Sequence, residues 1–265
     1  MIVCKSASEL ARMRAANLLV AEVLAEIKEL AVPGFTTAEL DATAEMRVRE
    51  AGAVPAFKGY RGYPATVCIS VNEEVVHGIP SSRKLAEGDI VSLDMGVLKD
   101  GFYGDAALTV GVGRISERAA ALLSVTEQAL ERAIARVRVG GRVSDIGHAV
   151  QAFVEAHGFS VVREFVGHGI GTELHEEPQI PNYGEPGRGA RLAAGMVLAI
   201  EPMVTMGRPG VKILHDGWTA VTRDGSLAAH FEHTVAVTPE GPWILTARAN
   251  RDQVPRPEFP LQVSE

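Results

Sequence analysis

The chain has 265 residues, of which 46% are hydrophobic, and 33 acidic against 26 basic residues give a formal net charge of −7. This length and apolar content suit a globular protein with a substantial core, while an acidic balance without a run of lysine or arginine argues against nucleic-acid binding. Cys4 and Cys68 are too few for a disulfide framework or a thiolate zinc site, and there is neither a secretory signal nor an apolar stretch of about 18 residues, so we expect a cytoplasmic protein without a membrane segment.

Two helices are predicted near the N-terminus. A capping box at Ser6–Glu9 precedes apolar residues at helical spacing and predicts an amphipathic helix over about residues 8–30, which ends before Pro33. A second capping box at Thr36–Glu39 opens a helix that extends to about Glu50.

Strands and then helices are predicted in the middle of the chain. Three segments rich in β-forming residues are separated by turn signals, at residues 66–72, 89–98 and 102–112. Lys99-Asp100-Gly101 is typical of a hairpin turn between the last two. Helical patterns follow over residues 116–138 and 144–156, and a second β-rich half extends from 159 to 237.

The order of elements repeats along the chain. Residues 85–94 align with residues 192–201 at an offset of 107 positions, and the same offset pairs Gly34 and Thr37 with Gly141 and Ser144. Two matches at one offset indicate a duplicated unit of a helix followed by a strand. The repeat places Asp94 and Glu201 at corresponding strand positions, facing each other across a pseudo-two-fold axis.

Four acidic residues lie in apolar surroundings, where a lone carboxylate is costly unless it is paired or bound to metal. Asp94 and Glu201 are flanked by strand-like apolar residues, the hairpin brings Asp105 alongside Asp94, and Glu232 opens the final predicted strand. Each acid alone is more often a strand-end or salt-bridged group. Together with His168, however, they form a set that fits two divalent ions if some carboxylates bridge.

The stretch GHGIGTELHEEP contains two histidines, His168 and His175. It is not the helical motif of zinc proteases, because Gln179 stands where that motif needs its second histidine. The intervening glycines disfavour a helix, so we expect the two histidines to have different roles.

Several other residues fit ordinary structural roles when taken alone. His77 fits a turn or packed histidine and His175 a loop residue that bonds the backbone, while the aromatic candidates fit the core or surface; these are Tyr60, Tyr63 and Trp218. We interpret Glu176, Glu177 and His233 as solvent-facing groups or as partners of the ligands.

Five stretches together resemble, in order and spacing, the type I methionine aminopeptidases of the short bacterial kind: GYRGYPATVCISVNEEVVHGIP, LDMGVLKDGFYGD, GHGIGTELHEEP, AIEPMV and FEHTVAV. The resemblance covers about residues 1–246 and implies one catalytic domain with the α+β pita-bread fold, in which helices cover antiparallel sheets and two pseudo-symmetric halves surround a dinuclear metal site. We expect the polar, proline-punctuated tail at residues 247–265 to be disordered. The implied activity is that of a metalloprotease, a hydrolase that removes the initiator methionine when the second residue is small.

The resemblance also assigns roles to individual residues. The implied metal ligands are Asp94, Asp105, His168, Glu201 and Glu232, with Asp105 and Glu232 bridging the ions. The implied catalytic residues are His77, His175 and Glu201, and both histidines also bind substrate. The implied methionine pocket consists of Phe57, Tyr60, Tyr63, Cys68, His77, Leu174 and Trp218, whose aromatic and sulfur groups suit a thioether. Phe57 and Leu174 depart from bacterial members that commonly carry cysteine and phenylalanine there.

The expected mechanism is peptide hydrolysis by a metal-bridging hydroxide between two divalent ions about 3.5 to 4 Å apart. Glu201 would shuttle the water proton, His175 would donate to the oxyanion, His77 would bond near the scissile nitrogen, and one metal would take the substrate α-amine. The ligand types admit Co, Mn, Fe or Zn. Asn72 resembles part of a monovalent-cation site in some relatives. The expected partners are N-termini of nascent polypeptides at the ribosome, with the enzyme acting as a monomer.

Two alternatives share the expected fold. Prolidases and proline-specific aminopeptidases use the same five ligands, but they usually carry a further N-terminal domain for which this chain has no room. A pita-bread binding module without catalysis typically loses ligands, whereas all five are present here.

Overall fold

The computed structural model describes residues 2–248, so all but the first two residues of the predicted tail lie outside the described residues. The elements in chain order are α1 (Ala7–Leu30), α2 (Thr37–Glu50), β1 (Val54–Pro55), the 3₁₀ helix η1 (Tyr60–Gly62), β2 (Val67–Val71), β3 (Glu74–Val76), β4 (Ile90–Lys99), β5 (Phe102–Gly111), α3 (Glu117–Ile134), α4 (Val143–Ala156), β6 (Ser160–Val161), β7 (Gly167–Gly169), β8 (Glu176–Ile180), β9 (Val197–Ile200), β10 (Met203–Thr205), β11 (Val211–Ile213), β12 (Ala220–Thr222), β13 (Ala228–His230), β14 (Glu232–Thr238) and β15 (Gly241–Ile244).

The first two helices begin where the sequence predicts. The Ser6 hydroxyl accepts the Glu9 N–H at 3.4 Å, and the Glu9 carboxylate accepts the Ser6 N–H at 2.7 Å. Thr36 and Glu39 exchange the same pair of bonds. Both predicted capping boxes are therefore confirmed, and each satisfies N–H groups that the first helical turn leaves free.

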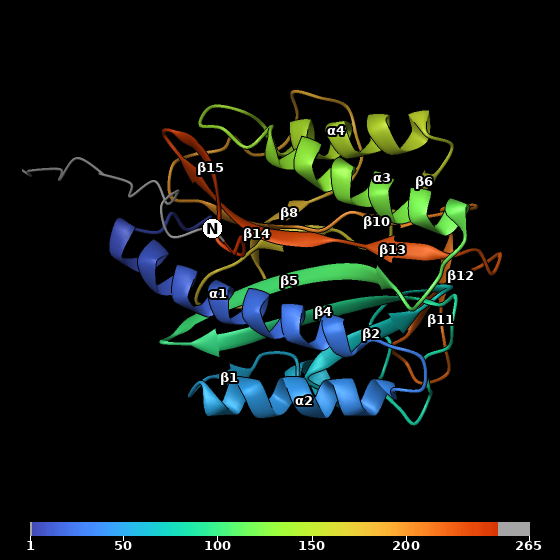
Figure 1. The fold of residues 1–265 in the computed structure, drawn as a ribbon. Helices are drawn as coiled ribbons and strands as arrows, with labels where there is room; N and C mark the ends of the chain where they lie inside the picture. The colour runs from blue at the N-terminus through green and yellow to red at the C-terminus, as the bar shows by residue number, and fades with distance from the viewer. Residues whose placement is uncertain (1, 249–265) are drawn as a thin grey trace, which may run out of the picture.

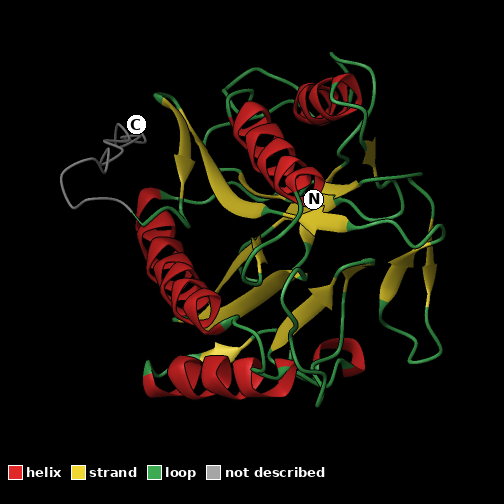
Figure 2. Ribbon diagram, turned by 45° about the vertical axis from the view of Figure 1, so that its right-hand side comes forward, coloured by secondary structure: helices red, strands yellow, loops and turns green. Residues whose placement is uncertain are grey.

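A nine-stranded antiparallel sheet forms the centre of the protein. Its main path runs β1-β4-β5-β14-β9-β7-β8, with β2 paired to β4 and β15 to β14, and two further sheets have three strands each. Figure 1 shows α1 with α2 on one side and α3 with α4 on the other, and Figure 2 shows the strands in the interior between these helices.

The two halves of the sheet repeat the same arrangement. Strands β4 and β5 with α1 and α2 enclose one hydrophobic core around Val20 and Leu93, and β9 and β14 with α3 and α4 enclose another around Leu122 and Leu198. The halves meet where β5 pairs with β14. The expected fold of antiparallel sheets covered by helices in two similar halves is confirmed.

The predicted hairpin joins β4 to β5. Asp100 and Gly101 have φ angles of 52° and 80°, and Lys99 pairs with Phe102. Positive φ at both central residues matches the right-handed twist of the flanking strands. A two-residue turn fixes the register, and this register places Gly96 opposite Asp105.

Two predictions about element ends were wrong. The helix predicted over residues 116–138 ends at Ile134, because the N–H groups of Arg136 and Val137 bond carbonyls only three residues back and this tighter turn buries Val137 in the second core. Glu232 does open β14, but β14 is not the final strand, since β15 folds back onto it.

None of the helices within residues 2–248 combines the length and the apolar character that a bilayer-spanning segment needs.

Candidate active site

The sheet register brings three of the predicted ligands to one face. Directly opposed residues of antiparallel strands point to the same face, and residues two apart along a strand share it. Asp94 of β4 lies opposite Ala107 of β5, which lies opposite Glu232 of β14, and Asp105 precedes Ala107 by two residues. The small side chain of Ala107 separates the three carboxylates without filling the space between them.

The other two predicted ligands reach the same face from the second half. His168 of β7 lies opposite Ala199 of β9, and Ala199 lies opposite Thr234 of β14. Glu201 is two residues beyond Ala199, and Thr234 is two residues beyond Glu232. Ligand candidates that span much of the chain therefore converge because of strand pairing rather than sequence proximity.

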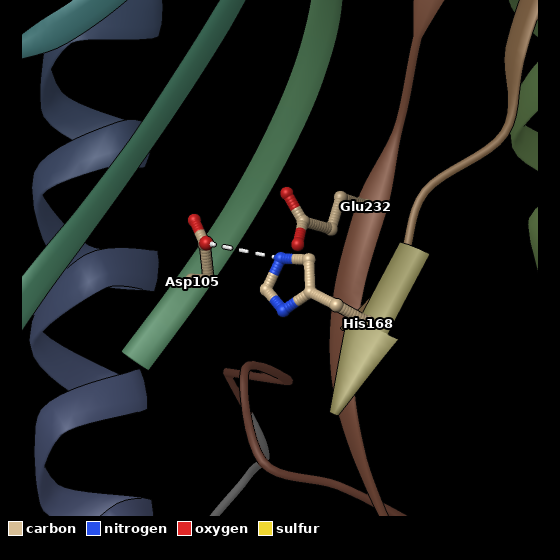
Figure 3. Close-up of side chains that lie close together, drawn as sticks. All are labelled: Asp105, His168 and Glu232. Carbon is tan, nitrogen blue, oxygen red and sulfur yellow. Dashed lines mark ion pairs between the residues drawn. The ribbon is translucent and has the colours of Figure 1, made fainter. Parts of the chain in front are cut away.

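The convergence leaves space suited to a cation. Asp105, His168 and Glu232 each offer a ligand atom within 4.8 Å of the others (Figure 3). His168 Nε2 lies 4.0 Å from Asp105 Oδ2 and 3.6 Å from Glu201 Oε1, beyond hydrogen-bonding range. Such separations are about twice a typical metal–ligand distance of about 2.0–2.2 Å.

The orientation of His168 favours ligation through one nitrogen. Its Nδ1 lies 2.9 Å from the carbonyl oxygen of Gly169, which can only accept a hydrogen bond, so Nδ1 carries the proton. Burial lowers the pKa of His168 to about 3, and the neighbouring His175 contributes in the same direction. The ring is thus neutral, and its free Nε2 lone pair faces the carboxylates, as metal-binding histidines require.

The four carboxylates carry more negative charge than their surroundings can balance. All are at most 9% exposed, and among the described residues no lysine or arginine pairs with them. Burial raises the pKa of Asp94 to about 8, and burial together with the neighbouring acids raises the pKa values of Asp105, Glu201 and Glu232 well above their usual range. Within the described part of the chain, Asp105 Oδ1 and Glu232 Oε1 have no hydrogen-bond partner. A divalent cation would supply both the missing charge and the missing partners, so the residues fit a metal site.

A cavity of about 160 Å³ opens onto this face. Its walls include every residue predicted as a ligand, a catalytic group or part of the methionine pocket. They also include Arg61 and Val76, which no sequence pattern singled out. The structure therefore brings the predicted residues into one site.

His175 lines the cavity next to His168. The two rings lie 4.2 Å apart between centroids, and the Tyr60 hydroxyl lies 2.9 Å from His175 Nδ1, while within residues 2–248 the other ring nitrogen makes no hydrogen bond. The Tyr60 ring stacks on the imidazole at 5.3 Å. Partial burial and then the charge of Arg61 lower the pKa of His175.

His77 occupies a constrained turn after β3. Its φ of 60° is uncommon for a residue with a side chain, and the turn is held by the bond from the Ile69 N–H to the Gly78 carbonyl at 2.9 Å. The ring packs edge-on against Phe165 and Trp218 at 5.4 and 6.2 Å. Burial, followed by the neighbouring His175, lowers the pKa of His77 to about 4, which keeps the ring neutral at pH 7.

Aromatic rings form an apolar wall of the cavity. The Tyr63 hydroxyl donates to the Gly78 carbonyl at 2.8 Å, and its ring meets Trp218 edge-on at 5.2 Å. The polar end of Tyr63 is thus satisfied, and its ring, with buried Cys68 and Leu174, is left to contact an apolar side chain.

Two residues around the site were missed or misjudged from the sequence. Buried His230 has Nε2 3.8 Å from Glu201 Oε2, and within residues 2–248 neither of its ring nitrogens has a hydrogen-bond partner. Only its spacing of two residues from Glu232 could have singled it out. Of the two interpretations given for Glu176, the solvent-facing one was wrong, because its side chain is 10% exposed and pairs with buried Lys5.

Asn72 sits in a separate turn outside this cavity. Its side-chain amide donates to Asp89 Oδ1 at 2.8 Å, and its side-chain oxygen accepts the Ile90 N–H at 3.0 Å. These bonds hold a local turn in which Asn72 has a positive φ of 61°, a backbone angle that asparagine tolerates. A monovalent cation near Asn72 stays a prediction.

Comparisons with known proteins agree with the geometry. The family model described as metallopeptidase family M24 matches residues 11–239. A methionine aminopeptidase from Clostridium perfringens is 54% identical over 246 residues, which cover 93% of this chain and 99% of the relative. The crystal structure of a methionine aminopeptidase from Thermotoga maritima has a TM-score of 0.92 at 50% identity, with 93% of this chain and 99% of that chain covered.

A solved prolidase from Pyrococcus furiosus is a more distant match. It has a TM-score of 0.75 at 23% identity, covers 94% of this chain and is itself covered over 66% of its length, so it shows a shared fold only. The family match, the high identity to bacterial relatives and the buried cluster of metal-ligand side chains agree. The chain therefore belongs to metallopeptidase family M24 and groups there with the bacterial type I methionine aminopeptidases.

Proposed function

We propose that this protein removes the N-terminal methionine from polypeptides with a small second residue by metal-dependent hydrolysis. The observation that carries the proposal is the buried cluster of Asp105, His168 and Glu232, which opens into a cavity with an aromatic and sulfur-containing wall. The cluster provides hydrolytic chemistry, and the wall provides a place for an apolar first side chain.

Asp94, Asp105, His168, Glu201 and Glu232 would hold divalent cations. When bound, such cations activate water and polarise a carbonyl group as Lewis acids. The side chains balance this charge with four carboxylates and one neutral imidazole. We propose that these residues would hold two ions, to which Asp105 and Glu232 on the paired central strands β5 and β14 would both contribute.

Glu201 accepts the proton of the attacking water and returns it to the leaving amine. His175 donates from Nε2 to the carbonyl oxygen as negative charge develops there, provided that the Tyr60 hydroxyl donates to Nδ1. Both lowered pKa values keep His77 and His175 neutral at pH 7, so each can donate one hydrogen bond without adding charge. His77 bonds near the scissile nitrogen.

The methionine side chain would contact the apolar wall. Its members are Phe57, Tyr60, Tyr63, Cys68, His77, Leu174 and Trp218. Sulfur–aromatic contacts favour a thioether over a branched alkyl chain. Phe57 lines this wall, and we propose that its ring favours a narrow, unbranched side chain.

Finer features of the proposal concern the working state of the enzyme. We propose that residues 1–246 act as one catalytic domain, as a monomer in the cytoplasm, on chains that emerge from the ribosome. The ions would be Co, Mn, Fe or Zn, with a monovalent cation near Asn72. Size measurement in solution tests the monomer, and metal analysis of protein purified without added metal tests the identity of the ions.

The decisive assay is release of methionine from Met-Ala-Ser by chelated protein before and after refilling with each ion. Restoration by at least one divalent ion is expected. A panel of X-Ala-Ser peptides tests the pocket, and equal turnover of Leu and Met would exclude methionine selectivity. Turnover of an Xaa-Pro dipeptide instead would favour a prolidase, and metal binding without turnover of either substrate would favour a binding module.

A further inference from the structure

A buried ion pair lies next to the loop that carries two cavity-lining residues, Leu174 and His175. Lys5, in the segment before α1, pairs with Glu176, the first residue of β8, across a separation of 171 positions. Their side chains are 2% and 10% exposed. Surface ion pairs contribute little to stability, but a buried pair differs. Removal of either partner leaves the other as an uncompensated charge away from water, which is strongly destabilising.

Glu176 holds the loop that carries His175. Its Oε1 accepts the backbone N–H groups of Thr172 at 2.9 Å and of Glu173 at 3.4 Å, while its Oε2 receives Lys5. One carboxylate therefore closes the turn that ends in Leu174 and His175. Leu174 is part of the apolar wall, and His175 is the proposed donor to the substrate carbonyl oxygen.

Lys5 is held by two further hydrogen bonds and is closely approached by two glycines. Its backbone N–H donates to the Gly195 carbonyl at 2.7 Å, and its Nζ also donates to the Val3 carbonyl at 3.2 Å. A Cβ at Gly195 would collide with the backbone of Lys5, and a Cβ at Gly171 would collide with the end of its side chain. The surrounding backbone therefore leaves a space that the Lys5 ammonium group fills. A side chain at position 171 would occupy that space, which explains the glycine there in GHGIGTELHEEP.

The pair couples the N-terminal segment to the reaction site. In its ion pair with Lys5, the Glu176 carboxylate also accepts two backbone amides, and hydrogen bonds from N–H groups to a carboxylate are the strong ones. Without Lys5, the buried carboxylate would lose its cation partner and move toward water, and this movement would weaken its hold on Thr172 and Glu173.

We infer that Lys5 and Glu176 are positioning residues that hold His175 and Leu174 in place at the cavity wall. The inference rests on the proposed function, and neither residue contacts the cavity itself. The expected consequence is a loss of kcat without a loss of metal.

The first test compares the Lys5→Met holoenzyme with wild type on Met-Ala-Ser. We expect kcat to fall about tenfold, since small misplacements of catalytic groups cost up to about 10²-fold. Metal content should be unchanged, and the amides of Thr172 and Glu173 should exchange hydrogen faster by NMR. Arg14→Met is the matched control, because Arg14 is also a part-buried N-terminal cation but donates to the carbonyls of Ile244 and Leu245; its kcat should stay at the wild-type value.

The second test combines Lys5→Met with His175→Ala. If the pair acts through His175, Lys5→Met should lower kcat less than about twofold in the His175→Ala background, although it lowers Tm equally in both backgrounds. An equal loss of kcat in both backgrounds, or no loss in the wild-type background, would overturn the inference.

A third comparison holds even if Lys5→Met alone fails to fold, because neither variant leaves a buried charge. Lys5→Met with Glu176→Gln keeps an acceptor for the two amides, and Lys5→Met with Glu176→Ala removes it. We expect kcat of the first within about threefold of wild type and that of the second at least about tenfold lower; equal values refute the positioning role. Absence of methionine release by wild-type holoenzyme would instead refute the proposed function, and the amide exchange would still report on the ion pair.

Discussion

Replacing Asp94 by asparagine should stabilise the metal-free protein. The pKa of Asp94 is raised from its ordinary value of 3.8 to about 8 by burial. Between pH 3.8 and about pH 8, the Asp94 carboxyl keeps its proton in the folded state and has released the proton in the unfolded state. Stability of the metal-free protein is therefore highest below about pH 4 for this group and falls as pH rises toward 8.

The magnitude follows from the pH interval. About three pH units separate 3.8 from pH 7, and at about 1.4 kcal/mol per unit the cost reaches about 4 kcal/mol as an upper value. The Asp94→Asn variant would carry no such cost, because a neutral amide replaces the carboxyl with nearly the same shape. At about 2–4 °C per kcal/mol for a chain of this size, Tm should rise by about 10 °C.

The assay is thermal unfolding of chelated wild type and Asp94→Asn between pH 4 and pH 8. The Tm difference should vanish near pH 4 and grow toward pH 8. With metal present the order should reverse, since the variant has lost a ligand. A metal-free variant no more stable than wild type at pH 7 would show that Asp94 ionises without cost, and the electrostatic argument for the metal site would fail.

Four further perturbations separate the roles of individual residues. His175→Ala should lower kcat about 10²-fold with metal content unchanged, whereas His168→Ala should lose metal; equal metal loss in both, measured by elemental analysis, would contradict the division of roles. Tyr60→Phe should lower kcat about threefold to tenfold with little change in KM, because it removes the hydroxyl at His175 Nδ1; unchanged kcat would remove Tyr60 from the mechanism. Gly78→Ala should lower stability by about 1–3 kcal/mol in denaturant unfolding, because its Cβ would collide with the Ile69 carbonyl; a neutral effect would show that the His77 turn can adjust. Chelation should lower Tm of the wild type and abolish methionine release, and refilling should restore both.

Local patterns predicted much of the fold. The capping boxes at Ser6 and Thr36 and the hairpin at Asp100 use contacts between residues two to three positions apart, which a sequence displays directly. Ile134 and β15 show the limit of this approach. There the helix end and the extra strand depend on packing against the second core and on pairing with β14, and neither leaves a local signal.

Part of the candidate site could likewise be predicted from local sequence, and part depended on strand pairing. Apolar flanks around Asp94 and Glu201 indicated carboxylates that burial would make costly, and the internal repeat indicated that they face each other. The sequence left open whether His168 and His175 lie apart, and only the strand pairing of β7 with β9 and the turn before β8 bring their rings to 4.2 Å.

By itself, the amino-acid sequence determined which groups the protein possesses: the four acids, the histidines, and the family to which their spacing belongs. The tertiary structure alone decided that Lys5 neutralises Glu176 and that His230 approaches Glu201. Such contacts join parts of the chain that have no periodic or turn relationship. They exist because the segment before α1 packs against Gly195 of the second half and because β10 pairs with β13 just beyond Glu201, and the free energy of that packing belongs to the assembled core rather than to any local segment.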